Sequence, residues 1–158
     1  MLNNLRVSVV IPAYNEERYI KQCLKSLMAQ EVLPDEIIVV DNNCTDKTIK
    51  ICKEFPVKVI QERRQGMIFA RNSGFNSAKY KIIARTDADA ILPKDWIKKI
   101  KHNFFTNEID ALGGSLSFYD LPLNLKFFWR VFVFIVGKVL KGNVLIGPNM
   151  AITKNTWE

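Results

Sequence analysis

Four short apolar runs, separated by stretches with helical spacing, constrain the fold of this chain most strongly. The runs span residues 7–11, 36–40, 57–60 and 81–85 and are rich in valine and isoleucine. Continuous β-branched runs of this length are typical of strands buried on both faces of a parallel sheet. We expect Pro12 to end the first strand. The alternation predicts an α/β fold with a mostly parallel central sheet flanked by helices.

The first two stretches between these runs carry helix start and stop signals. Asn15 is expected to cap the first helix, with Glu16 in its first turn and apolar residues following at helical spacing. Thr45 or Asp46 is expected to cap a second helix, which Pro56 stops. Each strand is therefore expected to lead through a short loop into a helix.

Two further helices and one strand are expected in the rest of the chain. The helices cover residues 66–78 and 93–105, and the strand covers residues 109–118. Within that strand, Gly113 and Gly114 mark a bulge or a close approach of two backbones. The helix over 66–78 carries apolar side chains at roughly helical intervals, namely Met67, Phe69, Ala70 and Phe75.

Composition narrows the class of protein. A chain of 158 residues with 48% hydrophobic residues is large enough for one domain with its own core, which we expect to span 1–158. Cys23, Cys44 and Cys52 lack metal-ligand or disulfide spacing, and no signal peptide precedes the first run, so we expect reduced thiols in the cytoplasm.

The net charge of +7 suits an anionic partner. No nucleic-acid-binding signature accompanies it, so a phosphorylated small molecule or an anionic membrane surface is favoured over nucleic acid.

Two aspartates follow the fourth run, in the stretch Arg85-Thr86-Asp87-Ala88-Asp89-Ala90. In an extended backbone, Asp87 and Asp89 would project together from the end of the strand. Two such carboxylates are tolerated if solvent screens them, if one is protonated, or if a cation lies between them. A hard divalent cation suits clustered oxygens and could in turn hold a diphosphate. Because Asp-x-Asp also occurs in surface turns, the pattern alone does not decide.

Polar residues follow three of the expected strands. Asn15, Asp41 and Asp87 each lie just past a strand end. In a doubly wound sheet, ligands bind outside the carboxyl ends of the strands, so we expect these residues to cluster. For Asp41 alone, a role as a turn or capping residue is as well supported as a role in a site, because Asn42 and Asn43 follow it.

Five segments together resemble the nucleotide-sugar-binding half of the inverting family 2 glycosyltransferases. They appear in the family's order and span nearly the whole chain, at residues 9–17, 39–48, 66–74, 87–89 and 147–151. The resemblance implies a Rossmann-like GT-A fold. It also implies a nucleoside-diphosphate sugar, UDP- or GDP-linked, as the ligand, and a place in cell-envelope polysaccharide biosynthesis.

The resemblance further implies roles for individual residues. Asp41 would accept a hydrogen bond from the nucleobase, and Arg71 would lie near the base or the phosphates. Asp87 would face the ribose or the donor sugar, and Asp89 would ligate Mg²⁺ or Mn²⁺ bridging the two phosphates. The nucleotide pocket would be lined by Pro12, Ala13, Tyr14 and Glu16.

The resemblance does not supply a catalytic base. In the family, an aspartate downstream of the segment matched by residues 147–151 deprotonates the acceptor, and here the chain ends at Glu158. The chain therefore resembles an enzyme truncated before its base. The expected function is metal-dependent transfer of a sugar, with inversion, to a glycan, lipid-linked or other membrane-proximal acceptor. The alternative is a nucleotide-sugar-binding module that is inactive without a further segment. A related nucleotidyltransferase is disfavoured, because no glycine-rich basic loop follows the first strand.

Residues 123–141 predict a basic amphipathic helix. Its most apolar part, 127–140, would reach about 21 Å as a helix. That is short of the roughly 30 Å hydrocarbon core, so we do not expect it to span a membrane. Its cations gather on one side between residues 126 and 141, while the remaining arc is apolar. The apolar face could pack against protein, but we favour attachment at an anionic membrane surface, on the cytoplasmic face.

Overall fold

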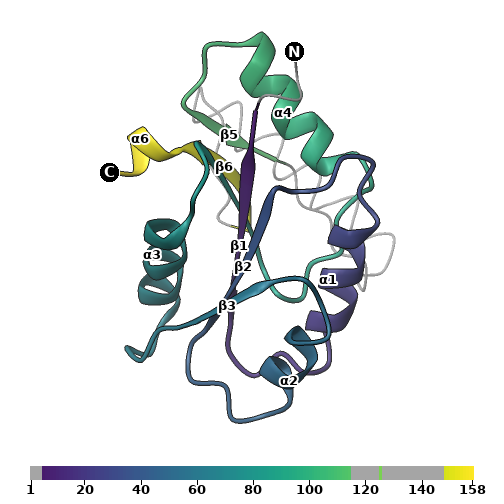
Figure 1. Ribbon diagram of the computed structural model, residues 1–158, viewed down its shortest axis with the longest axis vertical. Coiled ribbons are helices and arrows are strands. Elements are labelled where there is room, and N and C mark those ends of the chain that lie inside the picture. The colour runs from purple at the N-terminus through teal and green to yellow at the C-terminus, as the bar shows by residue number, and fades with distance from the viewer. Residues whose placement is uncertain (1–4, 115–124, 126–147) are drawn as a thin grey trace.

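The structure, a computed structural model, describes residues 5–114, 125 and 148–158 (Figure 1). The predicted helix over 123–141, with its cationic segment 126–141, lies outside these residues apart from Leu125. The elements in chain order are β1 (Val7–Ala13), α1 (Ile20–Met28), β2 (Glu36–Asp41), α2 (Thr48–Cys52), β3 (Lys58–Gln61), α3 (Met67–Ser77), β4 (Ile82–Thr86), α4 (Trp96–Thr106), β5 (Ala111–Gly113), β6 (Asn149–Thr153) and α6 (Lys154–Trp157).

The strands form one sheet in the order β3-β2-β1-β4-β6-β5. The strands β1 to β4 run parallel, as the alternating pattern predicts. The strand β6 pairs antiparallel with β4, and β5 pairs antiparallel with β6. The strands β2 and β3 lie on one side of β1, whereas β4 lies on the other. The direction of winding therefore reverses between β1 and β4, which creates a switch point at their carboxyl ends.

Helices cover both faces of the sheet, and side-chain alternation along the strands separates the core into two layers. Val9 and Ile11 pack with α1 and α4 on one face. Val10 and Ile38 pack with residues of α3 on the other face. Figure 1 shows α3 on the opposite side of the sheet from α1 and α2. Because β1 is central, the side chains of residues 7–11 are fully buried on both faces, which explains their nearly continuous apolar sequence.

Two glycines permit close backbone contacts. A Cβ added to Gly74 would lie 2.3 Å from Val10 Cγ1 and 2.9 Å from Val40 Cγ2, so α3 approaches the sheet over a residue without a side chain. A Cβ added to Gly114 would lie 2.2 Å from Asn149 Nδ2. The Gly114 N–H donates to the Asn149 carbonyl oxygen at 2.8 Å. The close backbone approach predicted for this glycine pair is confirmed at Gly114.

Two local expectations are wrong. The strand β1 continues through Pro12 to Ala13, because β4 pairs with β1 only as far as Val10 and leaves the proline with a partner strand on the β2 side alone. The helix α1 begins at Ile20 rather than after Asn15. Met67 and Phe69, which lie on the first turn of α3, are exposed, whereas Ala70 on the same turn is buried.

None of the helices within the described ranges is long and apolar enough to cross a lipid bilayer. All three cysteines are free, and two of them, Cys23 and Cys52, are buried.

Candidate nucleotide-binding site

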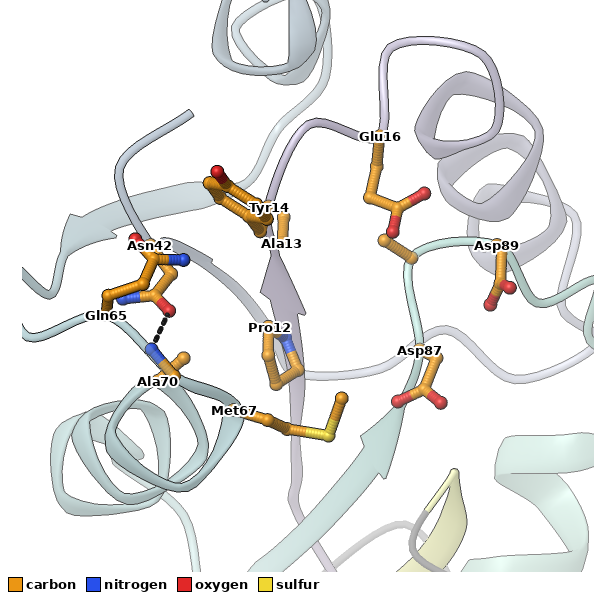
Figure 2. A pocket seen from close by; sticks show the side chains of 12 residues that line it. Pro12, Ala13, Tyr14, Glu16, Asn42, Gln65, Met67, Ala70, Asp87 and Asp89 are labelled. Atoms are coloured by element: carbon orange, nitrogen blue, oxygen red, sulfur yellow. Dashed lines mark hydrogen bonds between the residues drawn. The ribbon is translucent and has the colours of Figure 1, made fainter. Parts of the chain in front are cut away.

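A pocket of about 340 Å³ opens at the carboxyl ends of β1 and β4, beside the first turn of α3 (Figure 2). This is the switch point of the sheet. The pocket therefore lies where the topology of a doubly wound fold places a ligand. The lining residues are Pro12, Ala13, Tyr14, Glu16, Asn42, Gln65, Gly66, Met67, Ala70, Asp87, Ala88 and Asp89.

The two sides of the pocket differ in chemistry. Figure 2 shows the carboxylates of Glu16, Asp87 and Asp89 gathered on one side. Tyr14 and the side-chain amides of Asn42 and Gln65 lie on the other side, while Pro12 and Met67 lie between the two. One side can face a cation or sugar hydroxyls, and the other can face a flat, polar ring.

Hydrogen bonds between the loops after β1 and β2 hold Tyr14 and Glu16 in place. Asn15 has a φ of 56°, and its Oδ1 accepts the backbone N–H of Thr45 at 2.8 Å. The backbone N–H of Glu16 donates to Thr48 Oγ1 at 2.7 Å. Asn15 thus fixes the loop conformation instead of capping α1, which is why its neighbours on either side reach the pocket. Asparagine tolerates this left-handed conformation better than most residues.

Asn42 is the main site residue that the sequence analysis did not single out. It is 3% exposed, and its Nδ2 donates to the carbonyl oxygens of Glu62 and Arg64 at 2.9 and 2.8 Å. Its Oδ1 accepts the backbone N–H of Gly66 at 2.8 Å, the bond drawn in Figure 2. A single side chain thereby fastens the segment before α3 to the end of β2. The signal available in the sequence was a second polar residue directly after a buried strand.

Gly66 has a φ of 135°, a conformation that residues with a side chain rarely adopt. It immediately precedes α3, so it sets the angle at which that helix leaves the pocket. Gln65, Met67, Ala70 and Ala88 also line the pocket without having been predicted.

Asp87 and Asp89 reach the pocket by a different geometry from the one expected. The strand β4 ends at Thr86, and the Ala90 N–H donates to the Asp87 carbonyl oxygen at 3.2 Å. The two aspartates therefore lie in a turn, and the expectation that both project from an extended strand is wrong. The turn still brings both to the pocket, with Ala88 buried between them.

The carboxylates of the pocket influence one another. Burial raises the pKa of Glu16, and the negative charges of Asp89 and Asp87 raise it further. Asp87 accepts a hydrogen bond from Arg85 Nη2 at 2.9 Å. Glu16 and Asp89 form no ion pair within the described part of the chain. The acidic side is therefore a place where added positive charge would be stabilised.

The donor set fits a divalent cation that fills its remaining coordination positions with water or with a ligand. Among the described residues, no group of three histidine, cysteine, aspartate or glutamate side chains is arranged to hold a metal ion. Magnesium is commonly bound by one or two carboxylates, with the other positions filled by substrate phosphates and water. Carboxylate oxygens at the rim of an open pocket meet that requirement, so the residues present fit Mg²⁺ or Mn²⁺ arriving with a diphosphate.

Two predicted site residues do not line the pocket. Asp41 Oδ1 accepts the backbone N–H of Cys44 at 2.8 Å, which is the turn arrangement that the sequence left open. The guanidinium of Arg71 donates to Asn72 Oδ1 and lies 5.8 Å from the ring centroid of Trp157. The other six, including Asp87 and Asp89, line it. Ligand contacts of all eight remain predictions.

Comparisons with known proteins agree with this geometry. The sequence model of glycosyl transferase family 2 matches residues 8–145. The chain is 31% identical to glycosyltransferase GlyA of Streptococcus pneumoniae, over 76% of this chain and 18% of that protein. It is also 31% identical to glycosyltransferase AglE of Haloferax volcanii, over 71% of this chain and 40% of that protein. The chain thus spans less than half the length of these curated relatives.

Solved structures share the fold. Residues 1–349 of TarS from S. aureus, in complex with UDP-GlcNAc, align with a TM-score of 0.66 and 26% identity, over 75% of this chain and 37% of that one. Glucosyl-3-phosphoglycerate synthase from Mycobacterium tuberculosis, in complex with UDP, aligns with a TM-score of 0.71 and 23% identity, over 97% and 58%. The second likeness concerns the fold alone. The expected α/β fold of the GT-A type is confirmed.

Proposed function

Because the chain belongs to glycosyl transferase family 2, we propose that its pocket binds a nucleoside-diphosphate sugar and presents the sugar for transfer, with inversion, to an acceptor. The observation that carries the proposal is the two-sided pocket at the switch point, with carboxylates facing an aromatic and amide wall. A nucleotide sugar has matching parts, namely a flat base at one end and a hydroxyl-rich sugar beside a diphosphate at the other.

The base lies against the wall formed by Tyr14 and Gln65 in this proposal. Tyr14 is 52% exposed and offers a ring face on which a base can stack. Both N–H groups of the Asn42 amide donate to backbone carbonyls, its Oδ1 accepts a backbone N–H, and the residue is buried. Asn42 therefore shapes this wall and does not bind the base itself. Gln65 Oε1 accepts from Asn43, while its Nε2 has donors to offer to a base carbonyl.

The sugar and diphosphate lie toward the acidic side. Asp87 accepts hydrogen bonds from ribose or sugar hydroxyls, and Asp89 holds a divalent cation, Mg²⁺ or Mn²⁺. Bound there, the cation supplies Lewis-acid stabilisation of the departing diphosphate. Glu16, whose pKa is raised by burial and by the two aspartates, adds negative charge that favours the same cation.

Transfer with inversion also requires a base that deprotonates the acceptor hydroxyl on the face opposite the leaving group. We assign no described residue to this step. The alternative function is therefore a donor-binding module that transfers nothing without a further segment. Both functions use the same pocket, and they differ only in turnover.

The acceptor in this proposal is a glycan, a lipid-linked saccharide or another membrane-proximal molecule. The sequence of residues 126–141 supports it, because cations on one side of a wide apolar face suit an anionic headgroup surface. The protein would then work as a peripheral protein on the cytoplasmic face.

Calorimetric titration with UDP and with GDP, each with Mn²⁺ and with a chelator, tests the donor site. We expect metal-dependent binding of UDP, the nucleotide bound by the aligned TarS structure. Failure of both nucleotides to bind would contradict the donor site, and equal affinity with and without Mn²⁺ would contradict the metal role. Release of UDP from UDP-GlcNAc, measured with and without candidate acceptors, then distinguishes an enzyme from a binding module.

A further inference from the structure

Arg85 is a charged residue within a fully buried stretch of β4. It is 5% exposed, and the pairing register places it beside Val10 of β1 and Met150 of β6. A guanidinium in such surroundings is costly unless a counter-charge lies next to it.

The described contacts of the guanidinium all come from one nitrogen. Arg85 Nη2 donates to Asp87 Oδ1 at 2.9 Å and lies 3.0 Å from Met67 Sδ. Both partners line the pocket. Arg85 Nε is buried and has no hydrogen-bond partner among the residues that the structure describes, and Asp87 is the one carboxylate paired with Arg85 there. The charge of Arg85 therefore depends on Asp87 for its compensation.

This pair makes the two aspartates of the turn chemically unequal. The buried guanidinium of Arg85 holds the Asp87 carboxylate toward the α3 face of the sheet, and 28% of the Asp87 side chain remains exposed. Asp89 has no ion pair among the described residues. A divalent cation approaching the pocket thus meets one carboxylate that is already neutralised and one that is not.

We infer that Arg85 is a positioning residue that gives Asp87 and Asp89 different roles in the pocket. It holds Asp87 as a hydrogen-bond acceptor for donor hydroxyls and keeps that carboxylate away from the cation, so Asp89 alone of the two becomes the metal ligand. The inference rests on the proposed function, since it divides the work of the same pocket. Arg85 is not among the residues that line the pocket, so in this inference it acts through Asp87.

Removing the charge of Arg85 should then release Asp87 to bind metal. The test measures Mn²⁺ affinity, by electron paramagnetic resonance of free Mn²⁺ and without nucleotide, in four forms of the chain. We expect Asp89→Asn to weaken Mn²⁺ binding by about tenfold or more. Arg85→Met combined with Asp89→Asn should recover most of that loss, because the released Asp87 substitutes for the missing ligand. Arg85→Lys with Asp89→Asn should stay weak, because a lysine still neutralises Asp87.

A purely structural role for Arg85 would not raise metal affinity in any variant. If the Arg85→Met and Asp89→Asn double variant binds Mn²⁺ as weakly as Asp89→Asn alone while retaining its circular dichroism spectrum, the inference is overturned. Absence of Mn²⁺ binding in every form, wild type included, overturns it as well.

A second comparison leaves Arg85 in place and uses the circular dichroism spectrum as its folding control, because Asp87→Asn removes the counter-charge of Arg85. Asp87→Asn keeps an oxygen that can accept from Arg85. We expect it to weaken Mn²⁺ binding clearly less than Asp89→Asn does, because Asp87→Asn changes the charge near the cation but removes no ligand atom. Equal losses in the two variants would show that both aspartates ligate the cation. UDP titration of the wild-type chain separately decides the proposed function, because the Mn²⁺ measurements contain no nucleotide.

Discussion

Asn42 Oδ1 accepts the backbone N–H of Gly66 at 2.8 Å, across 24 residues of sequence. The bond joins the residue directly after β2 to the residue directly before α3. With the two bonds that Asn42 Nδ2 donates to the carbonyls of Glu62 and Arg64, it fixes one wall of the pocket. The integrity of this wall therefore depends on one buried amide.

Replacing Asn42 with alanine should lower the free energy of unfolding by about 3 kcal/mol, because it leaves buried backbone groups without partners. Urea denaturation followed by circular dichroism measures the loss. Asn43→Gly is the matched control, since Asn43 makes two bonds to the same segment but is less buried, and glycine tolerates its φ of 67°. A loss in the control as large as that in Asn42→Ala would show that Asn42 has no special role.

A methyl group at Gly74 should force α3 away from the sheet. The added Cβ would lie 2.3 Å from Val10 Cγ1, so we expect Gly74→Ala to destabilise the fold by about 2 kcal/mol or more. Ser73→Ala in the same helix should change stability little.

A double-mutant cycle gives the sharper test of that contact. Val10→Ala removes the group that the new methyl would strike, so Gly74→Ala should cost clearly less in the Val10→Ala background. Additive losses in the double variant would mean that the strain of Gly74→Ala arises elsewhere.

Glu16 should make stability depend on pH. Its pKa is raised in the folded chain from the ordinary value of 4.5, by burial and by the charges of Asp89 and Asp87. The folded state therefore favours the protonated carboxyl. That contribution is fully present below pH 4.5 and is lost as the pH rises through the raised pKa of the folded state.

Glu16→Gln, which cannot ionise, should accordingly raise the Tm relative to wild type at pH 7 and change it little at pH 4. Thermal unfolding at both pH values measures the difference. Glu17→Gln serves as the control, because Glu17 is adjacent but does not line the pocket. An equal Tm shift at the two pH values would contradict the electrostatic explanation.

Residues 126–141 should attach the chain to anionic vesicles. Combining Arg130→Glu with Lys138→Glu should reduce co-sedimentation with vesicles of phosphatidylglycerol and phosphatidylcholine, because it reverses two charges on the cationic side. Lys50→Glu with Lys53→Glu, at and just after α2, is the control with the same change in net charge. No reduction by the first pair would favour packing of this segment against protein, and equal reductions by both pairs would indicate a non-specific charge effect.

The repeating pattern of the sequence was enough to predict the parallel part of the fold. The strands β1 to β4 and the helices between them follow from local apolar runs and helical spacing. The polar residues at strand ends pointed to the carboxyl edge of the sheet, where the pocket lies, although of Asn15, Asp41 and Asp87 only Asp87 lines it. The predicted backbone path was wrong at Pro12, at Asn15 and at the turn of Asp87 and Asp89. At each of these positions the backbone conformation depends on which segment of the chain lies beside it.

The strand pairing and side-chain contacts between distant segments that complete the site could not be predicted from the sequence. The strand β6, more than 60 residues after β4, inserts antiparallel beside it, and Asn42 reaches across to Gly66. The link of Arg85 to both Asp87 and Met67 also requires β4 and α3 to be neighbours.

The sequence by itself therefore determined which segments become strands and helices and which edge of the sheet carries the pocket, because burial periodicity is a local property of the chain. Only the tertiary structure decided which buried polar group meets which partner. A buried amide or guanidinium needs a counterpart, and the counterpart is chosen by the order in which distant strands and helices pack together.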